Sequence, residues 1–167
     1  MGPSTVTTDA LLIQAVISDA STVPVLMRPL EKAVPGTVRL HAALSLVQKQ
    51  FYAYLHFDKR KPCTVDEAAS LQSSLQKELP QFENLRVSRL EQVFAIDGAS
   101  KGSAPVFHYA VEMDPESGWM PELSQWYDTE HMPGLAKVPG CIRASRFLNH
   151  DHGPLSLACY DLVAEET

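Results

Sequence analysis

The sequence contains Val34-Pro35-Gly36-Thr37-Val38-Arg39 and, further along, the closely similar stretch Val138-Pro139-Gly140-Cys141-Ile142-Arg143. The spacing that relates these two stretches also relates Pro29 to Pro133. Proline fixes φ and glycine permits backbone angles that other residues avoid, so both impose a geometric requirement. Their recurrence at one spacing predicts that the same helix-to-strand corner is built twice in an internally duplicated chain, the alternative being a chance coincidence of turn residues.

The first copy has the pattern of a ferredoxin-like domain. Thr64 and Glu67 have the spacing of a capping box, in which each side chain binds a free amide of the first helical turn, and Pro80 ends that helix. Runs of apolar and β-branched residues, bounded by turn formers, predict the strands. The order β-α-β-β-α-β, typical of the ferredoxin-like arrangement, is expected from strands at 11–18, 37–46, 51–58 and 85–96 and helices at 23–33 and 64–79.

A second copy follows residues 97–104, a glycine-containing linker without large apolar residues. A strand at 105–113, a helix at 117–131 and a hairpin formed by 141–148 and 155–162 are expected there. We therefore predict an α+β fold of ferredoxin-like repeats with antiparallel sheets, with a first repeat in 1–98 and an incomplete βαββ repeat in 105–167. An open sheet edge is an aggregation hazard, which makes a homodimer the expected assembly.

Composition narrows the classes of function. The chain has 167 residues, 45% of them hydrophobic, and a formal net charge of -6, which disfavours a nucleic-acid-binding surface. No long apolar run predicts a membrane span, and the N-terminal residues lack the pattern of a secretion signal, so a cytoplasmic protein is expected. The widely spaced Cys63, Cys141 and Cys159 are typical of buried free thiols rather than a disulfide framework or a zinc site.

The segment Trp126-Tyr127-Asp128-Thr129-Glu130-His131 is the first candidate for chemistry. Because Pro133 disfavours helical geometry at the preceding residue, the helix is expected to end near His131. Tyr127 and Asp128 lie four and three residues before His131, where a phenol or carboxylate can orient an imidazole for acid or base catalysis. Glu130 stands at the end of the helix where a carboxylate is disfavoured, so another interaction must favour it. The alternative is a surface helix end, but the first copy has the apolar Leu26-Met27 in place of Glu130-His131, and this asymmetry favours a site.

The first strand of the second copy supplies another candidate. Alternation between residues 106 and 113 places His108 and Glu112 on the face opposite the larger apolar side chains, which directs them into a cavity if the apolar face packs on helices. Tyr160 lies on a partner strand, and Arg143 is assigned a structural part in the repeated corner. His150-Asp151-His152 has metal-ligating residue types, but on a turn it is more typical of a polar hairpin loop. No metal is therefore expected, and without a glycine-rich phosphate loop no cofactor is expected either.

The stretch 126–133, followed by 138–140, Arg143, Arg146 and Phe147, resembles a signature of EthD-like and related proteins of the dimeric α+β barrel superfamily, and the strand 157–162 fits it. The resemblance implies a small ferredoxin-like fold in a superfamily that includes decarboxylases, cyclases, isomerases and monooxygenases of small, often aromatic or polyketide-derived molecules. One fold hosts many functions, so the resemblance is more specific for fold than for reaction.

From the residues and the resemblance together we expect a cofactor-independent enzyme, a lyase or isomerase, acting by proton transfer on an aromatic or polyketide-like carbonyl compound. The alternatives are a non-catalytic ligand-binding or stress-response protein and a degenerate enzyme. The expected catalytic residues are His131, His108, Glu130, Tyr127 and Asp128, and the expected substrate-binding residues are Trp126, Glu112 and Tyr160.

Overall fold

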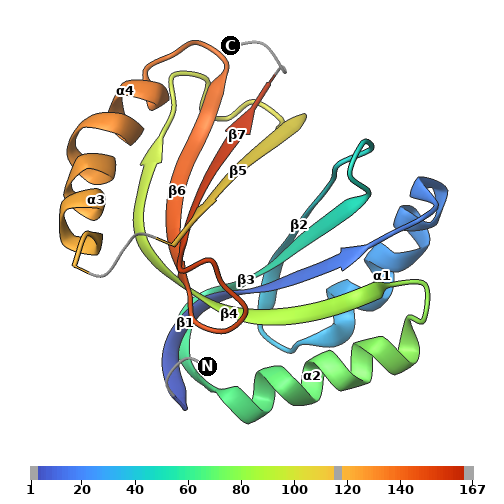
Figure 1. Cartoon of the computed structure of the whole chain (residues 1–167). Coiled ribbons are helices and arrows are strands. Elements are labelled where there is room, and N and C mark those ends of the chain that lie inside the picture. The colour runs from blue at the N-terminus through green and yellow to red at the C-terminus, as the bar shows by residue number, and fades with distance from the viewer. Residues whose placement is uncertain (1–3, 115–117, 164–167) are drawn as a thin grey trace. The chain divides into compact units, whose positions relative to one another are not determined.

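A computed structural model describes residues 4–114 and 118–163 of the chain (Figure 1). The chain divides into two compact units, one formed by residues 1–91 and 150–152 and the other by residues 92–149 and 153–167. The boundary between Glu91 and Gln92 falls inside a single strand, β4, which contributes its first half to unit 1 and its second half to unit 2. The division into two duplicated repeats at 98 and 105 stays a prediction.

Unit 1 has the element order expected from the sequence. The strand β1 pairs antiparallel with both β3 and β4, and β2 pairs antiparallel with β3, giving the order β2-β3-β1-β4. Thr64 and Glu67 form both hydrogen bonds of the predicted capping box at the start of α2. The elements are β1 (Thr5–Val16), the 3-10 turn η1 (Ala20–Thr22), α1 (Val23–Ala33), β2 (Thr37–Leu44), β3 (Gln50–Thr64), α2 (Val65–Glu78) and β4 (Glu83–Asp97).

One face of the unit 1 sheet carries the core. Alternate residues of β1, among them Leu11 and Ile13, pack with Leu26 and Leu30 of α1 and with Leu75 of α2. All five side chains are buried, and burying an aliphatic side chain of this size stabilises the fold by roughly 1.5–3 kcal/mol. The two helices therefore cover the same face of the sheet.

Unit 2 follows the expected order β-α-β-β. Its strands are hydrogen-bonded in the order β4-β6-β7-β5, with β7 antiparallel to both β5 and β6. The helical segments pack on one side of this sheet (Figure 1). The elements are β5 (Phe107–Met113), α3 (Met120–Trp126), the π-helical turn η2 (Tyr127–His131), α4 (Met132–Ala136), β6 (Cys141–Asn149) and β7 (Ser156–Leu162).

The helical segment of unit 2 does not end at His131, and that expectation was wrong. The chain widens into η2, where the Met132 amide donates to the Tyr127 carbonyl, and continues as α4 to Ala136. Pro133 lacks an amide hydrogen, and in the first turn of α4 this donor is not required by the helix. The wider turn thus accommodates the proline without ending the helix. The expected start of the helix at Ser117 lies outside the described residues.

Both copies of the recurrent corner use glycine in the left-handed region. Gly36 has φ of 88° and Gly140 has φ of 100°, angles that residues with a Cβ rarely adopt. The glycine of each corner is therefore required by the backbone, as the sequence predicted.

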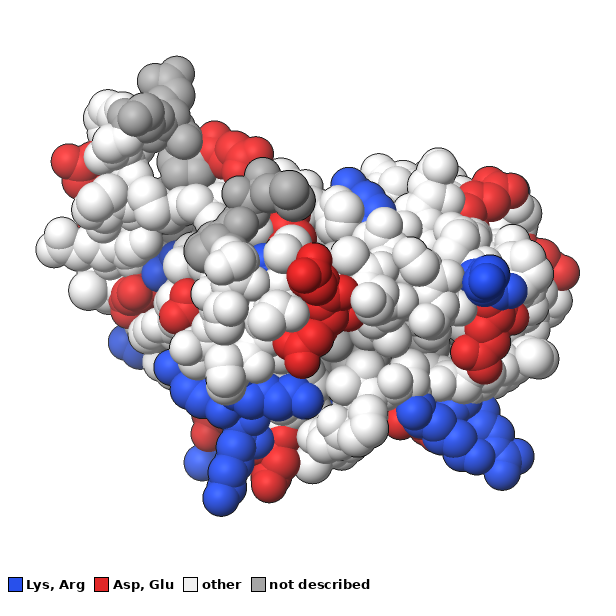
Figure 2. Space-filling view, turned by 90° about the horizontal axis from the view of Figure 1, so that it is seen from below, with Lys and Arg blue, Asp and Glu red and all other residues white. Residues whose placement is uncertain are grey.

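The fold is a mixed α+β fold with an antiparallel sheet, as expected. None of its helices, within the described residues, is long and apolar enough to cross a membrane. On the face shown in Figure 2, acidic and basic side chains are interspersed among uncharged ones.

Candidate functional site

The helix-covered face of the unit 2 sheet brings together most of the residues singled out from the sequence. Tyr127 of η2 and Met132 of α4 pack on Ala144 of β6 and on Ala158 and Tyr160 of β7. Because side chains alternate along a strand, Tyr109 and Arg146 share this face with their cross-strand neighbours Tyr160 and Ala158. We call the following residues the helix-side cluster: Tyr109, Trp126, Tyr127, Asp128, His131, Arg146 and Tyr160.

The π-helical turn fixes three rings against one another. The ring of His131 stacks on Trp126 with centroids 4.4 Å apart and planes inclined by 20°. Tyr127 meets the same imidazole edge-on, at 5.2 Å and 88°. Single π-turns within helices occur frequently at functional sites, because they change the direction of side chains relative to a regular helix. Here the turn places an oriented imidazole between two aromatic rings, while Glu130 is exposed.

Asp128 forms its ion pair with Arg146 rather than with His131. Nη2 of Arg146 donates to both carboxylate oxygens at 3.1 and 3.2 Å, and Nε donates to Oδ1 at 3.3 Å. The Arg146 side chain is only 2% exposed and that of Asp128 is 32% exposed, so the guanidinium is shielded from solvent and the carboxylate is partly open to it. Nη1 of the same guanidinium is buried and has no hydrogen-bond partner among the described residues.

Two tyrosines of the cluster are held as neutral phenols. Burial raises the pKa of Tyr127, an effect that Arg146 partly offsets and Tyr109 reinforces. Burial also raises the pKa of Tyr160 far above its ordinary value, and Tyr127 adds to the rise. The hydroxyl of Tyr160 is buried and, within the part of the chain that the structure describes, makes no hydrogen bond. Both phenols therefore keep their O–H groups at neutral pH and are hydrogen-bond donors.

The rim of the cluster is aromatic and open to solvent. Tyr109 is 59% exposed and Trp126 is 44% exposed, whereas Tyr127 and Tyr160 beneath them are buried. The rings of Tyr109 and Tyr160 lie 6.1 Å apart. Exposed aromatic rings offer a surface on which an aromatic compound can stack.

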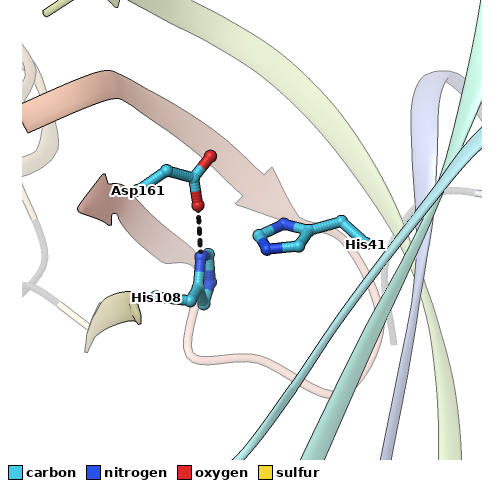
Figure 3. A group of neighbouring side chains, drawn as sticks. All are labelled: His41, His108 and Asp161. Carbon is cyan, nitrogen blue, oxygen red and sulfur yellow. Dashed lines mark hydrogen bonds and ion pairs between the residues drawn. The ribbon is translucent and has the colours of Figure 1, made fainter. Parts of the chain in front are cut away.

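His108 lies on the opposite face of the unit 2 sheet. Its Nδ1 is 2.9 Å from Oδ1 of Asp161, which faces it directly across β5 and β7 (Figure 3). Glu112 shares that face by alternation. His108 and Asp161 are residue types that bind metal ions, but these two ligands are fewer than the roughly four that a structural metal site requires. The two histidines predicted for proton transfer thus belong to different faces and do not form one site.

The segment grouped from the sequence has residues that lie together in the structure, but two partners of the candidate residues were not identified. Trp126, Tyr127, Asp128, His131 and Tyr160 all lie in the helix-side cluster, whereas His108 and Glu112 do not, and Glu130 is exposed. No functional role was predicted for Arg146 or Asp161 from the sequence. Asp161 is one residue from the end of β7 and pairs with His108 only through the β5–β7 register, which local sequence does not reveal.

The segment His150-Asp151-His152 is held as a polar loop of unit 1. Asp151 forms a buried ion pair with Arg89, with Oδ1 and Nη2 2.8 Å apart. His150 contacts Glu91 at 3.1 Å and His152 contacts Gln72 at 3.0 Å. Each polar side chain of the loop therefore has a protein partner.

Two solved structures share this fold. A protein described as a "putative monooxygenase" from Fusobacterium nucleatum has a TM-score of 0.61 and 10% sequence identity, over 93% of this chain and 76% of that one. Another with the same description, from Lactobacillus acidophilus, has a TM-score of 0.60 and 11% identity, over 94% and 77%. No family model and no curated protein matches the sequence. At this identity the likeness concerns the fold alone.

Proposed function

We propose that the chain is a cofactor-independent enzyme of the EthD-like kind, which transfers a proton on a small aromatic or polyketide-like carbonyl compound bound at the helix-side cluster. The observation that supports this best is the His131 imidazole, oriented by Trp126 at 4.4 Å and by Tyr127 at 5.2 Å. A positioned imidazole is the commonest general acid or base in enzymes, because its protonation changes near neutral pH.

His131 takes a proton from the carbon beside the carbonyl group, which leaves an imidazolium and an enolate. Returning that proton to another carbon completes an isomerisation, and loss of a leaving group from the enolate completes an elimination. Trp126 contacts the aromatic ring of the substrate, and Tyr127 holds the imidazole in place. The proton and the charge thus balance within the pair formed by His131 and the substrate.

The test is deuterium incorporation into acetophenone and related aryl ketones in heavy water, followed by proton NMR. The His131→Gln variant is expected to lose about a hundredfold or more of the exchange rate, the usual contribution of a general base. His150→Gln is the matched control, since His150 is half-buried like His131 but lies in unit 1, where it contacts Glu91. Exchange in His131→Gln at the rate of the control variant would overturn the proposal.

His108 is the second candidate for the base. Asp161 holds its Nδ1 at 2.9 Å, as a carboxylate does when it orients a catalytic histidine. Loss of exchange in His108→Gln, with full exchange in His131→Gln, would move the reaction to the other face of the sheet. The same samples in an oxygen electrode report whether the enolate consumes oxygen, the reaction class named for the two structural neighbours.

A non-catalytic ligand-binding protein is the alternative function. It is favoured by one observation: among the described residues, His131 makes ring contacts but no hydrogen bond to a carboxylate. Saturable binding of aryl ketones, without deuterium exchange in the wild-type protein, would select this alternative.

A further inference from the structure

Arg146 binds Asp128 through one edge of its guanidinium, and its Nη1 group makes no hydrogen bond to that carboxylate. Nε and Nη2 donate to the Asp128 carboxylate, while Nη1 is buried without an acceptor among the described residues. Guanidinium stays protonated in proteins, so Nη1 keeps both of its N–H donors. Buried donors are usually paired, and one without a protein partner in a polar cluster points to an acceptor supplied by a ligand.

The hydroxyl of Tyr160 is a second buried donor on the same face. Arg146 lies opposite Ala158, and Tyr160 lies opposite Ala144, so Arg146 and Tyr160 are diagonal neighbours on the β6–β7 pair. Diagonal neighbours have Cα atoms roughly 7–8 Å apart, within reach of long side chains. The Tyr160 side chain is buried, and its hydroxyl has no partner in the described ranges 4–114 and 118–163. Two hydrogen-bond donors of different strands thus lie beneath the rings of η2.

We propose that Arg146 and Tyr160 form an oxyanion site, which binds the oxygen of a neutral, enolisable carbonyl compound and stabilises the charge that develops on it. This inference rests on the proposed function and names the substrate class. Hydrogen bonds to an oxygen strengthen as it becomes negative, so donors fixed in a buried site favour the enolate over the ketone.

The charge of Asp128 determines whether the site favours a neutral carbonyl group or a carboxylate as its ligand. Its charge already balances that of Arg146, with Nη2 3.1 Å from Oδ1. A carboxylate ligand would place a second negative charge in a buried site that holds one cation, which is electrostatically unfavourable. A neutral ketone avoids this cost and acquires charge only as His131 removes its proton. The site therefore selects against carboxylates in the ground state.

The test uses 4-nitrophenol as a probe, since its phenolate oxygen mimics the enolate and its ionisation is visible in the absorption spectrum. The apparent pKa of the protein-bound probe is expected to be lower by about one unit or more in the wild type than in the double variant Arg146→Lys/Tyr160→Phe, because both proteins keep the charge of Asp128 and only the wild type donates to the charged oxygen. Arg146→Lys keeps a cation for Asp128 but removes Nη1, and Tyr160→Phe removes only the hydroxyl. Each variant is expected to lose half or more of the pKa shift, whereas the matched control Arg60→Lys, at an exposed ion pair, keeps all of it.

Competition experiments test the substrate class. Acetophenone is expected to displace bound 4-nitrophenol at least about tenfold better than benzoate, because each 1.4 kcal/mol of unfavourable interaction costs a factor of ten. Benzoate that competes as well as acetophenone would overturn the inference. So would an unchanged probe pKa in both Arg146→Lys and Tyr160→Phe, with both variants folded by circular dichroism.

The failure of this inference can be told from failure of the proposed function. The probe measurement requires no turnover, and His131→Gln is expected to keep the pKa shift while losing deuterium exchange. Exchange that depends on His131 but not on Arg146 or Tyr160 overturns the oxyanion site alone. A pKa shift that depends on both donors, without exchange of any ketone, supports the oxyanion site and overturns the proposed function.

Discussion

The ion pair between Arg89 and Asp151 is predicted to contribute more to the stability of unit 1 than any exposed pair. Asp151 accepts from the Arg89 backbone amide at 2.8 Å, from Nε at 3.0 Å and from Nη2 at 2.8 Å. The Arg89 side chain is fully buried, and its Nη1 donates to the Cys63 carbonyl at 3.0 Å. Asp151→Ala therefore leaves a buried guanidinium without its counter-charge.

Removing one partner of a buried ion pair costs about 3–5 kcal/mol, a large part of the 5–15 kcal/mol that typical domains have in total. The matched control is Asp9→Ala, which breaks the pair with Arg60, whose side chain is 54% exposed. Exposed pairs contribute about 0–1 kcal/mol. Urea unfolding followed by far-ultraviolet circular dichroism measures both variants, and a loss in Asp151→Ala no greater than in the control would refute this reasoning.

Three further predictions concern pH, packing and thiol reactivity. Burial alone would raise the pKa of Asp151, but the hydrogen bonds from the Arg89 side chain and backbone outweigh it and lower the pKa below 3.8. The ionised Asp151 carboxylate therefore stabilises the fold at pH values above the ordinary pKa of aspartate, and this stabilisation is lost as the pH falls through the lowered pKa of Asp151. Acid unfolding of the wild type should show this loss, and acid unfolding of Asp151→Ala should not. Gly98→Ala should destabilise unit 2 by about 1–3 kcal/mol in thermal unfolding, because a Cβ there would collide with the backbone of Cys141 and Ile142; an unchanged Tm would contradict it. Burial, followed by the charge of Asp161, raises the pKa of the Cys141 thiol, and all three cysteines are buried. Ellman's reagent should thus react slowly with the native protein and fully after unfolding, and fast reaction at neutral pH would contradict the buried environment.

The fold was largely predictable from local signals. Three local features each impose a geometric requirement and each predicted its element. They are the capping box of Thr64 and Glu67, the glycines of the two corners and the alternation in the strands. The helical segment beyond His131 was not predictable in this way. A proline usually ends a helix, and the π-helical turn that accommodates Pro133 depends on the packing of Tyr127 and Met132 against the sheet.

The candidate site was predictable only in part, for a similar reason. The segment from Trp126 to His131 is contiguous, so its residue types were visible together. Arg146 and Asp161 acquire their partners through strand register and packing between distant segments. Asp128 was expected beside His131 on grounds of helical spacing, but the widened turn η2 and the nearby Arg146 give it a different partner.

The most direct measurement is an NMR titration that follows the imidazole signals of His131 and His108 as acetophenone is added. If the ketone binds at the helix-side cluster, the His131 signals shift and saturate, together with those of Tyr160, while the His108 signals stay in place. Saturable shifts confined to His108, with His131 unaffected, would contradict the account and place the ligand on the other face of the unit 2 sheet.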